Sequence, residues 1–359
     1  MFTCMIRLPI LLLTLLLPTL SFSKERYYSR FNTDAFWQTL VPDSPGTTIR
    51  VSSADTAIIV ASNREPAPGQ LRFMSEIRGD GTIRYFIVYS RAGSWHIQQH
   101  SSLRDAINVL PQKDKDWIVY TEGMGKIFTT DLDRGMNLAG QYGVHVLLLD
   151  YPSIRSSYKG YRNYRFAYRN ARIAYKDFAR VLDTFRRLRT DGDAGSGSIS
   201  LFFHSMGSNV MRKLARKDML VRFNDTKWVD NIILNAPCVP RRRSRQWMDR
   251  IHFAKRMYVH YNSQDRTLKL ARIVGFRQIL GEHPKQPVSD SALFINFNTL
   301  CGEGHSNFLS LYGRLHVTRE ALLHYNTLFH GGAVDLHDAT KYRKTAYRSI
   351  GWDLLPAGH

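Results

Sequence analysis

Hydrophobic positions follow two different spacings along most of the chain. Short runs rich in β-branched and aromatic residues at 82–90 and 199–205 predict strands. The run VHVLLLDYP at 144–152 is dominated by apolar residues, which is typical of a strand buried on both faces of a parallel sheet. The segment 166–185 has the spacing of an amphipathic helix. Its apolar residues at steps of three or four are Ala167, Ala171, Ala174, Phe178, Leu182 and Phe185.

Predicted strands and helices alternate through the rest of the chain. The other predicted strands are 95–100, 116–121, 228–235, 256–262 and 292–298. The other predicted helices are 102–110, 131–143 and 208–217. Strand and helix in this order favour an α/β fold with a doubly wound, mainly parallel sheet. Ligands of such sheets bind beyond the carboxyl ends of the strands, so the turns after the strands are where chemistry is expected.

The length of 359 residues suits one large α/β domain. Residues 24–80 show no clear period apart from a plausible strand at 56–61. We therefore expect an N-terminal extension of unclear structure over 24–80 and a single domain over 81–359.

The first 23 residues differ from the rest. Arg7 precedes an uncharged apolar run at 10–20, and the small residues Ser21 and Ser23 follow it. This order is typical of a secretory signal peptide, and the apolar run is short for a membrane span. We expect an exported protein, periplasmic or secreted, whose mature chain begins near Lys24. An uncleaved N-terminal anchor is the alternative.

The net charge of +20 predicts attraction to polyanions. The densest basic run, RRRSR at 241–245, has no interleaved aromatic residues, and the chain carries no nucleic-acid-binding motif. We therefore expect electrostatic contact with anionic envelope surfaces and no specific nucleic acid partner. A merely solvated basic surface would account for the charge equally well.

One turn carries the pattern of a nucleophile. The apolar strand ending at Phe203 and His204 runs into Ser205, Met206 and Gly207, and a helix follows. A strand, a sharp turn and a helix around x-Ser-x-Gly make a nucleophile elbow, which presents the hydroxyl beside a helix N-terminus that favours developing negative charge. A plain helix N-cap is the alternative role of Ser205.

The segment 116–305 resembles the α/β-hydrolase superfamily. It is most similar to a poorly characterised group of bacterial esterase/lipase-like proteins that carry HSMG at the elbow, as this chain does at 204–207. The resemblance implies a serine hydrolase acting on carboxylic esters. The chain departs from the usual pattern at Phe203, where Gly is common, and at Glu122, where relatives carry His before the glycine corresponding to Gly123.

The resemblance also implies that the acid and then the base follow the nucleophile in the chain. Asp265 comes just after a predicted strand, and His305 lies in the glycine-rich stretch GEGHSNFL. Asp265 would fix the tautomer of His305, which would take the proton of Ser205. Asp265 could instead cap the next helix, and His305 could be a surface histidine. The weaker candidates for these two roles are Asp230, Asp290, His330 and His337.

Acyl transfer needs donors for an oxyanion. The backbone N–H of Met206, directly after the nucleophile, is the first candidate. By resemblance the second is the N–H of Met124, in the turn TEGMG at 121–125. An ordinary glycine turn is the alternative there.

Cysteine content bounds the remaining chemistry. Without the signal peptide the chain keeps Cys238 and Cys301, both near strand ends, and a disulfide between them would tether the His305 loop. No HExxH or paired Cys and His spacing indicates a metal, and no glycine-rich phosphate loop indicates a nucleotide, so no cofactor is expected.

The sequence supports two hypotheses for the function. The first is an esterase or lipase-like hydrolase that uses Ser205, Asp265 and His305 on a small-molecule or lipid ester. The second, suggested by Phe203, Glu122 and the high charge, is a non-catalytic protein of the same fold that binds anionic envelope components.

Overall fold

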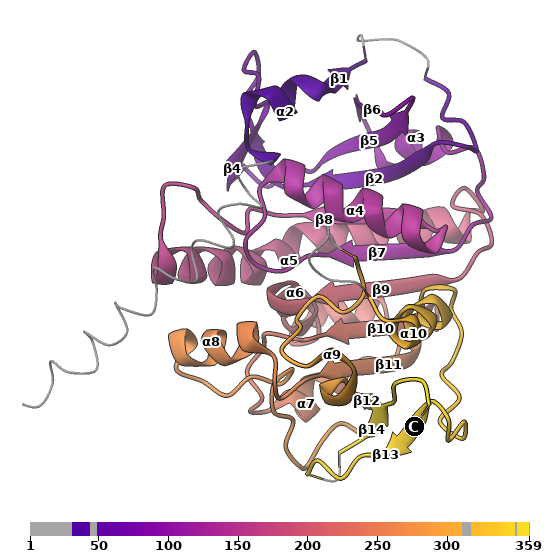
Figure 1. The fold of residues 1–359 in the computed structure, drawn as a ribbon. Helices are drawn as coiled ribbons and strands as arrows, with labels where there is room; N and C mark the ends of the chain where they lie inside the picture. The colour runs from indigo at the N-terminus through magenta and orange to yellow at the C-terminus, as the bar shows by residue number, and fades with distance from the viewer. Residues whose placement is uncertain (1–30, 44–48, 311–316, 349, 359) are drawn as a thin grey trace, which may run out of the picture.

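The structure is a computed structural model that describes residues 31–43, 49–310, 317–348 and 350–358 (Figure 1). The predicted signal peptide at 1–23 lies outside these described residues. None of the described helices is both long enough and apolar enough to cross a membrane.

Within the described residues, twelve strands form one sheet in the order β1-β6-β5-β2-β8-β7-β9-β10-β11-β12-β14-β13. Neighbours from β2 through β8 to β14 are parallel, whereas β5 runs antiparallel to β2 and β6. The strands are β1 (Leu40–Pro42), β2 (Thr56–Ser62), β5 (Arg84–Arg91), β6 (Ser94–His100), β7 (Trp117–Thr121), β8 (His145–Asp150), β9 (Ile199–His204), β10 (Val229–Asn235), β11 (Ala254–Tyr261), β12 (Leu293–Asn296), β13 (Tyr342–Lys344) and β14 (Trp352–Leu354). A small second sheet pairs β3 (Arg64–Pro66) with β4 (Met74–Arg78).

Helices cover both faces of the large sheet, and two separate hydrophobic clusters fill the space beneath them. Figure 1 shows α4 and α10 in front of the strands and the paler α5 behind them. The front cluster includes residues of α2 (Asp34–Thr39), α4 (Phe128–Tyr142) and α10 (Arg319–Phe329). The rear cluster includes residues of α3 (Leu103–Asn108), α5 (Gly160–Thr190), α6 (Ser208–Leu214), α7 (Ser244–Met248) and α8 (Arg266–Gly275). The predicted doubly wound, mainly parallel fold is confirmed.

The strongest sequence patterns correspond to the most buried elements. Every residue of β8 is buried, as its apolar sequence predicted. The predicted helix 166–185 is part of the longer α5, and its apolar stripe lies in the rear cluster. Burying a side chain such as Phe178 contributes about 1.5–3 kcal/mol, so this stripe fixes how α5 lies on the sheet.

The region before residue 81 is part of the same sheet. Strand β2 lies between β5 and β8, with Ile58 paired to Val146 in the parallel register. A strand from the segment before residue 81 therefore shares one sheet with the strands of the predicted domain over 81–359. The sequence pattern missed this because β2 stands alone in a polar segment, and its partner β8 follows about ninety residues later.

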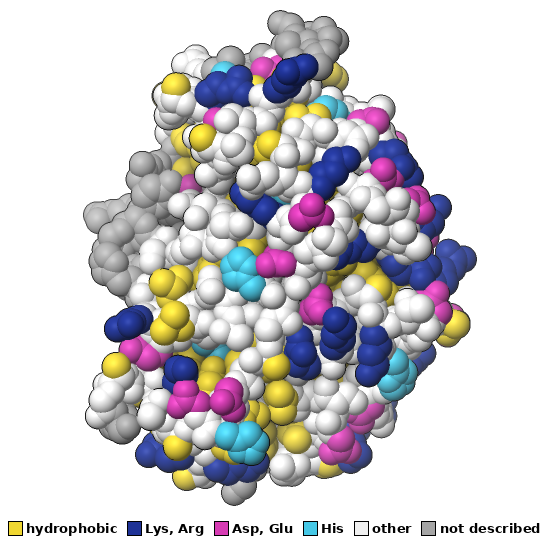
Figure 2. Space-filling model, turned by 90° about the vertical axis from the view of Figure 1, so that its right-hand side faces the viewer, with side chains coloured by type: hydrophobic (Ala, Val, Ile, Leu, Met, Phe, Trp, Pro, Cys, Tyr) yellow, Lys and Arg dark blue, Asp and Glu magenta, His cyan; other side chains and the backbone are white. Residues whose placement is uncertain are grey.

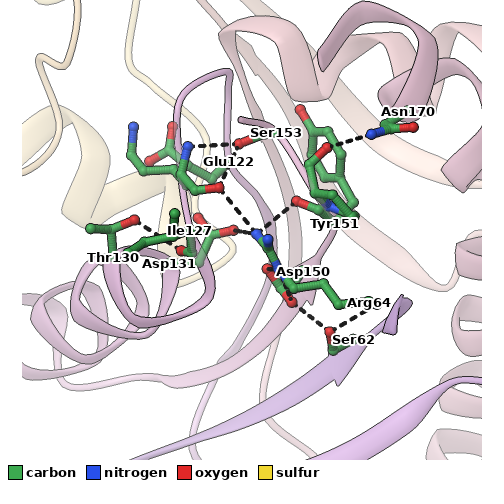
Figure 3. A network of polar contacts seen from close by, with 12 residues as sticks. Ser62, Arg64, Glu122, Ile127, Thr130, Asp131, Asp150, Tyr151, Ser153 and Asn170 are labelled. Atoms are coloured by element: carbon green, nitrogen blue, oxygen red, sulfur yellow. Dashed lines mark hydrogen bonds and ion pairs between the residues drawn. The ribbon is translucent and has the colours of Figure 1, made fainter. Parts of the chain in front are cut away.

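A buried arginine joins this N-terminal region to the turns at the carboxyl edge of the sheet (Figure 3). Arg64 is fully buried, and its Nε lies 2.9 Å from both carboxylate oxygens of Asp150. Its terminal nitrogen donates to the carbonyl of Tyr151 at 3.0 Å and to that of Lys126 at 3.1 Å. Asp131 lies 3.7 Å away, and burial together with the charge of Asp150 raises its pKa well above the ordinary value. Arg64 therefore pairs mainly with Asp150 and holds two loops by their backbones.

Charged side chains are mixed on the face that Figure 2 shows, where Lys and Arg (dark blue) lie among Asp and Glu (magenta). On this face the positive charge of the chain is spread over the surface and is not gathered into one patch.

We predict that Arg64→Met lowers the free energy of unfolding by about 3–5 kcal/mol, because it leaves the Asp150 carboxylate buried without a cation. Urea denaturation measures this change. The matched control is Arg72→Met, which removes an exposed ion pair with Asp34 and should cost less than about 1 kcal/mol. Equal effects of the two substitutions would show that burial of the Arg64 pair does not matter.

Candidate active site

Ser205 lies at a sharp turn between β9 and the short 3-10 helix η1 (Ser205–Gly207), which leads into α6. Its φ of +51° is in the left-handed region, which a residue with a side chain occupies only when its surroundings enforce it. Ser205 is 6% exposed. Helix α6 begins after Gly207 without a side-chain cap, so Ser205 is not its N-cap. The bulky Phe203 before the turn is fully buried, and its side chain packs within the rear cluster.

Two glycines bring the turns after β7 and β9 into direct contact. A Cβ on Gly207 would come within 2.6 Å of the carbonyl oxygens of Thr121 and Glu122. A Cβ on Gly123 would lie 2.8 Å from the Cβ and 3.3 Å from the Oγ of Ser205. Any side chain at either glycine would push the two turns apart.

In the turn after β7, the backbone N–H of Met124 differs from those of its neighbours. The N–H of Gly123 donates to the Glu122 carboxylate at 2.6 Å, and those of Gly125 and Lys126 donate to Ser153 at 3.0 and 2.8 Å. Between them, the N–H of Met124 has no hydrogen-bond acceptor among the described residues. Met206 lies in the first turn of η1, where an N–H has no partner within the helix.

Asp265 and His305 form a direct pair at the carboxyl edge of the sheet. The Nδ1 atom of His305 lies 2.6 Å from Oδ2 of Asp265, whose side chain is fully buried. The other carboxylate oxygen accepts the N–H of Leu268 at 2.9 Å and caps α8. Asp265 therefore contacts His305 with one carboxylate oxygen and caps α8 with the other.

The loop that carries His305 is fastened to the turn after β11. Asn262, which is buried, donates to the carbonyls of Gly302 at 2.7 Å and Gly304 at 3.2 Å. The ring of His305 lies 4.7 Å, centroid to centroid, from that of His204, the residue before Ser205. In the described part of the chain neither Ser205 Oγ nor His305 Nε2 has a hydrogen-bond partner. The hydrogen bond between a nucleophile and its base is often long in ligand-free enzymes and shortens when substrate binds.

The weaker acid and base candidates have other partners. Asp230 accepts from Lys255 and from the N–H of Ile199, near the amino ends of the strands. The other contacts are Asp290 with Arg245 and His330 with Asp116, and His337 is exposed on the surface. The structure brings none of them to Ser205.

A known protein family matches residues 99–287, and it is described as alpha/beta hydrolase of unknown function (DUF900). The chain belongs to this family. The match includes Ser205 and Asp265 and ends before His305. No curated protein matches the chain significantly.

Distant similarities to solved esterase structures accompany the family match. Carboxyl esterase 2 from the fungus Tuber melanosporum is 9% identical, with 74% of this chain and 86% of that one covered and a TM-score of 0.35. Esterase B from Lactobacillus rhamnosis, solved with a tributyrin phosphonate, is 11% identical, with 86% and 94% covered and a TM-score of 0.38. Membership of the hydrolase family rests on the family match and not on these structures.

The hydrolase carries a buried ion pair behind Ser205. Glu122 accepts from the Nε of Arg134 at 2.5 Å and from the hydroxyl of Tyr120. Burial alone would raise the pKa of Glu122, but the charges of Arg134 and Lys126 hold it well below the ordinary value. Glu122 is therefore an anion whose charge Arg134 compensates.

A chain of hydrogen bonds runs through the core from His204, which lies next to this ion pair. Asn235 Nδ2 donates to His204 Nδ1 at 3.0 Å, so the His204 proton is on Nε2, which lies 3.6 Å from Glu122. The hydroxyl of Tyr325 donates to Asn235 Oδ1 at 2.7 Å. Burial lowers the pKa of His204 far below its ordinary value, so it stays neutral. His204 is thus turned toward Glu122 and the ring of His305.

Two more buried histidines extend this chain. His260 Nδ1 lies 3.2 Å from the Tyr325 hydroxyl, whose own proton is already donated, so Nδ1 carries a hydrogen. Its Nε2 therefore accepts from Nε2 of His324 at 3.1 Å, and Nδ1 of His324 accepts from Tyr342 at 2.8 Å. Every donor points toward Glu122, which fixes one tautomer for each ring.

No sequence pattern indicates these supporting residues. Arg134, Asn235 and Tyr325 come from three different elements, and no local spacing relates them to Ser205. In the described ranges no group of three or more His, Cys, Asp or Glu side chains is arranged to hold a metal.

The disulfide considered between Cys238 and Cys301 is absent, because both are free thiols. Burial raises the pKa of each to about 12, so neither is a reactive thiolate at neutral pH. The His305 loop is held by Asn262 instead.

We predict that acid destabilises the hydrolase through its histidine chain. Burial lowers the pKa of His324 to about 3 and that of His260 well below its ordinary value, whereas both have a pKa near 6.5 when unfolded. As the pH falls below about 6.5, only the unfolded state takes up these protons, so stability falls by about 1.4 kcal/mol per pH unit for each histidine.

Urea unfolding between pH 7 and pH 5 measures this slope, and His324→Asn should remove the share of one histidine. His337→Asn, at an exposed position, is the control and should keep the full slope. A wild-type slope that His324→Asn leaves unchanged would contradict the assignment.

Proposed function

We propose that the protein is a serine hydrolase that cleaves carboxylic esters with Ser205, His305 and Asp265. The observation that carries the proposal is the 2.6 Å pair of Asp265 and His305 beside the left-handed turn at Ser205. Family membership supports hydrolysis as the reaction class. Cys238 and Cys301, whose thiol pKa values are both raised to about 12, are poor alternatives as nucleophiles.

In the proposed reaction Ser205 Oγ attacks the acyl carbon and passes its proton to Nε2 of His305. The carboxylate of Asp265 keeps the other ring nitrogen protonated and stabilises the imidazolium that forms. His305 then protonates the leaving alcohol. Water, deprotonated by His305, attacks the acyl-enzyme and releases the acid and Ser205.

The proposed oxyanion donors are the N–H groups of Met206 and Met124. The Met124 group lacks an acceptor among the described residues while its neighbours are satisfied, which suits a donor kept ready for a ligand. Such preorganised donors stabilise the charge that develops on the carbonyl oxygen. Glu122 lies close by, but its pairing with Arg134 limits repulsion of that charge.

We predict that a fluorophosphonate probe labels the wild-type protein at Ser205 and that Ser205→Ala abolishes both labelling and turnover of short-chain nitrophenyl esters. Peptide mapping by mass spectrometry identifies the labelled residue. The matched control is Ser208→Ala, three residues later, where the hydroxyl donates to the Phe203 carbonyl and should not be labelled. Absence of labelling in folded wild-type protein would overturn the proposal.

We predict that Asp265→Asn lowers kcat/KM for the same esters by roughly 10³- to 10⁴-fold, because an amide cannot hold His305 in the required tautomer. Asparagine caps a helix about as well as aspartate, so unfolding stability should change by less than about 1 kcal/mol. Steady-state kinetics and thermal unfolding of one preparation separate the two effects. Retention of most of the activity would exclude Asp265 as the acid.

A further inference from the structure

Three guanidinium groups meet around Tyr168 on the rear face of the sheet. The guanidinium carbons of Arg172 and Arg277 lie over the Tyr168 ring, 5.1 and 4.1 Å from its centroid. Arg277 also donates to the Tyr168 hydroxyl at 2.7 Å, and Arg212, whose pKa is lowered by burial, interacts electrostatically with Tyr168. These four residues, which we call the Tyr168 cluster, come from α5, from α6 and from the segment after α8.

The cluster contains no acidic residue. Within the described part of the chain, none of its three arginines forms an ion pair with Asp or Glu. Each arginine is partly buried, and the Nε atoms of Arg172 and Arg212 are buried without a hydrogen-bond acceptor. Buried charge costs free energy unless an opposite charge or hydrogen bonds compensate it. This arrangement therefore lacks an anion.

Neighbouring residues add to the positive charge. Burial lowers the pKa of Lys213, and the charges of Arg172, Arg212, Lys217 and Arg216 lower it further. Elsewhere on α5 the pattern is different, since Arg186 pairs with both Asp183 and Asp225. The absence of acidic partners is thus a property of this cluster and not of α5 as a whole.

The cluster is firmly built. Besides its contacts with Tyr168, Arg277 donates to the hydroxyl of Tyr164 at 3.0 Å, and the two tyrosine rings are nearly parallel with centroids 6.3 Å apart. The ring contacts restrict two guanidiniums before any ligand arrives, which reduces the entropy lost on binding. Tyr164 also interacts with Cys238, whose N–H donates to the carbonyl of Ser205 at 2.9 Å. Tyr164 and Cys238 therefore connect the cluster to the segment that holds Ser205.

We propose that the Tyr168 cluster binds a phosphate group. Guanidinium groups recognise phosphate through paired, charge-assisted hydrogen bonds. The tetrahedral oxygens of phosphate can meet donors that arrive from three directions, whereas a planar carboxylate offers two oxygens in one plane. The phosphate belongs either to a soluble ligand or to a lipid headgroup. The proposal does not depend on ester hydrolysis.

Titration of the full-length protein with inorganic phosphate, against chloride at equal ionic strength, tests this site. We expect saturable binding by calorimetry and a phosphate-dependent rise in Tm of wild-type protein. Arg212→Gln should bind phosphate about tenfold more weakly. Arg186→Gln, which removes an acid-paired arginine from another part of α5, should bind as wild type does. Without phosphate, Arg212→Gln should unfold at the same or a higher temperature, because it relieves repulsion.

Sedimentation with vesicles identifies the source of the phosphate. Binding to vesicles of phosphatidylcholine with phosphatidic acid, competed by phosphate and lost in Arg212→Gln, supports a lipid headgroup. Binding of phosphate without vesicle binding supports a soluble ligand. No binding in either assay, or equal binding by wild type and Arg212→Gln, overturns the proposal. Ser205→Ala should retain binding, so failure of the hydrolase proposal would be recognised separately.

Discussion

The buried pair of Arg64 and Asp150 is the interaction on which the carboxyl edge of the sheet depends. The guanidinium of Arg64, at the start of β3, is joined to Asp150 at the end of β8 and reaches the backbone carbonyls of Lys126 and Tyr151. Those carbonyls belong to the loops that flank the Met124 turn. The buried Arg64 guanidinium stays close to the Asp150 carboxylate, because separating them would leave two unpaired charges in a medium of low dielectric constant. The N-terminal strand is therefore structurally required by the site.

Three turns then lock onto one another around Ser205. Gly207 approaches the carbonyls after β7, Gly123 approaches the Ser205 side chain, and Cys238 donates to the Ser205 carbonyl. These contacts explain why a serine is held at φ +51° despite its steric cost. The hydrogen-bond chain that ends at His204, beside Glu122, adds a second constraint, since each histidine in it has one permitted tautomer. Rigid surroundings of this kind are what a preorganised site requires.

Much of the fold and part of the site could be predicted from the sequence because their signals are local. The apolar runs of β8 and β9 and the stripe of α5 record burial directly in the order of residues. The turn at Ser205 was recognisable because strand, serine, glycine and helix follow within a few residues. Asp265 and His305 were found only with the order that the resemblance implies, since about sixty and a hundred residues separate them from Ser205.

What the tertiary structure alone decided are the contacts between distant segments. The sequence established a mainly parallel α/β sheet and a serine at a strand-to-helix turn, because periodicity and turn residues act over short distances. It did not reveal that β2 lies inside the sheet, that Arg134 neutralises Glu122, or that Cys238 and Cys301 remain free. Nor did it show the arginines around Tyr168, which come from three separate segments. Charge compensation and strand order depend on three-dimensional proximity, which residue spacing does not encode.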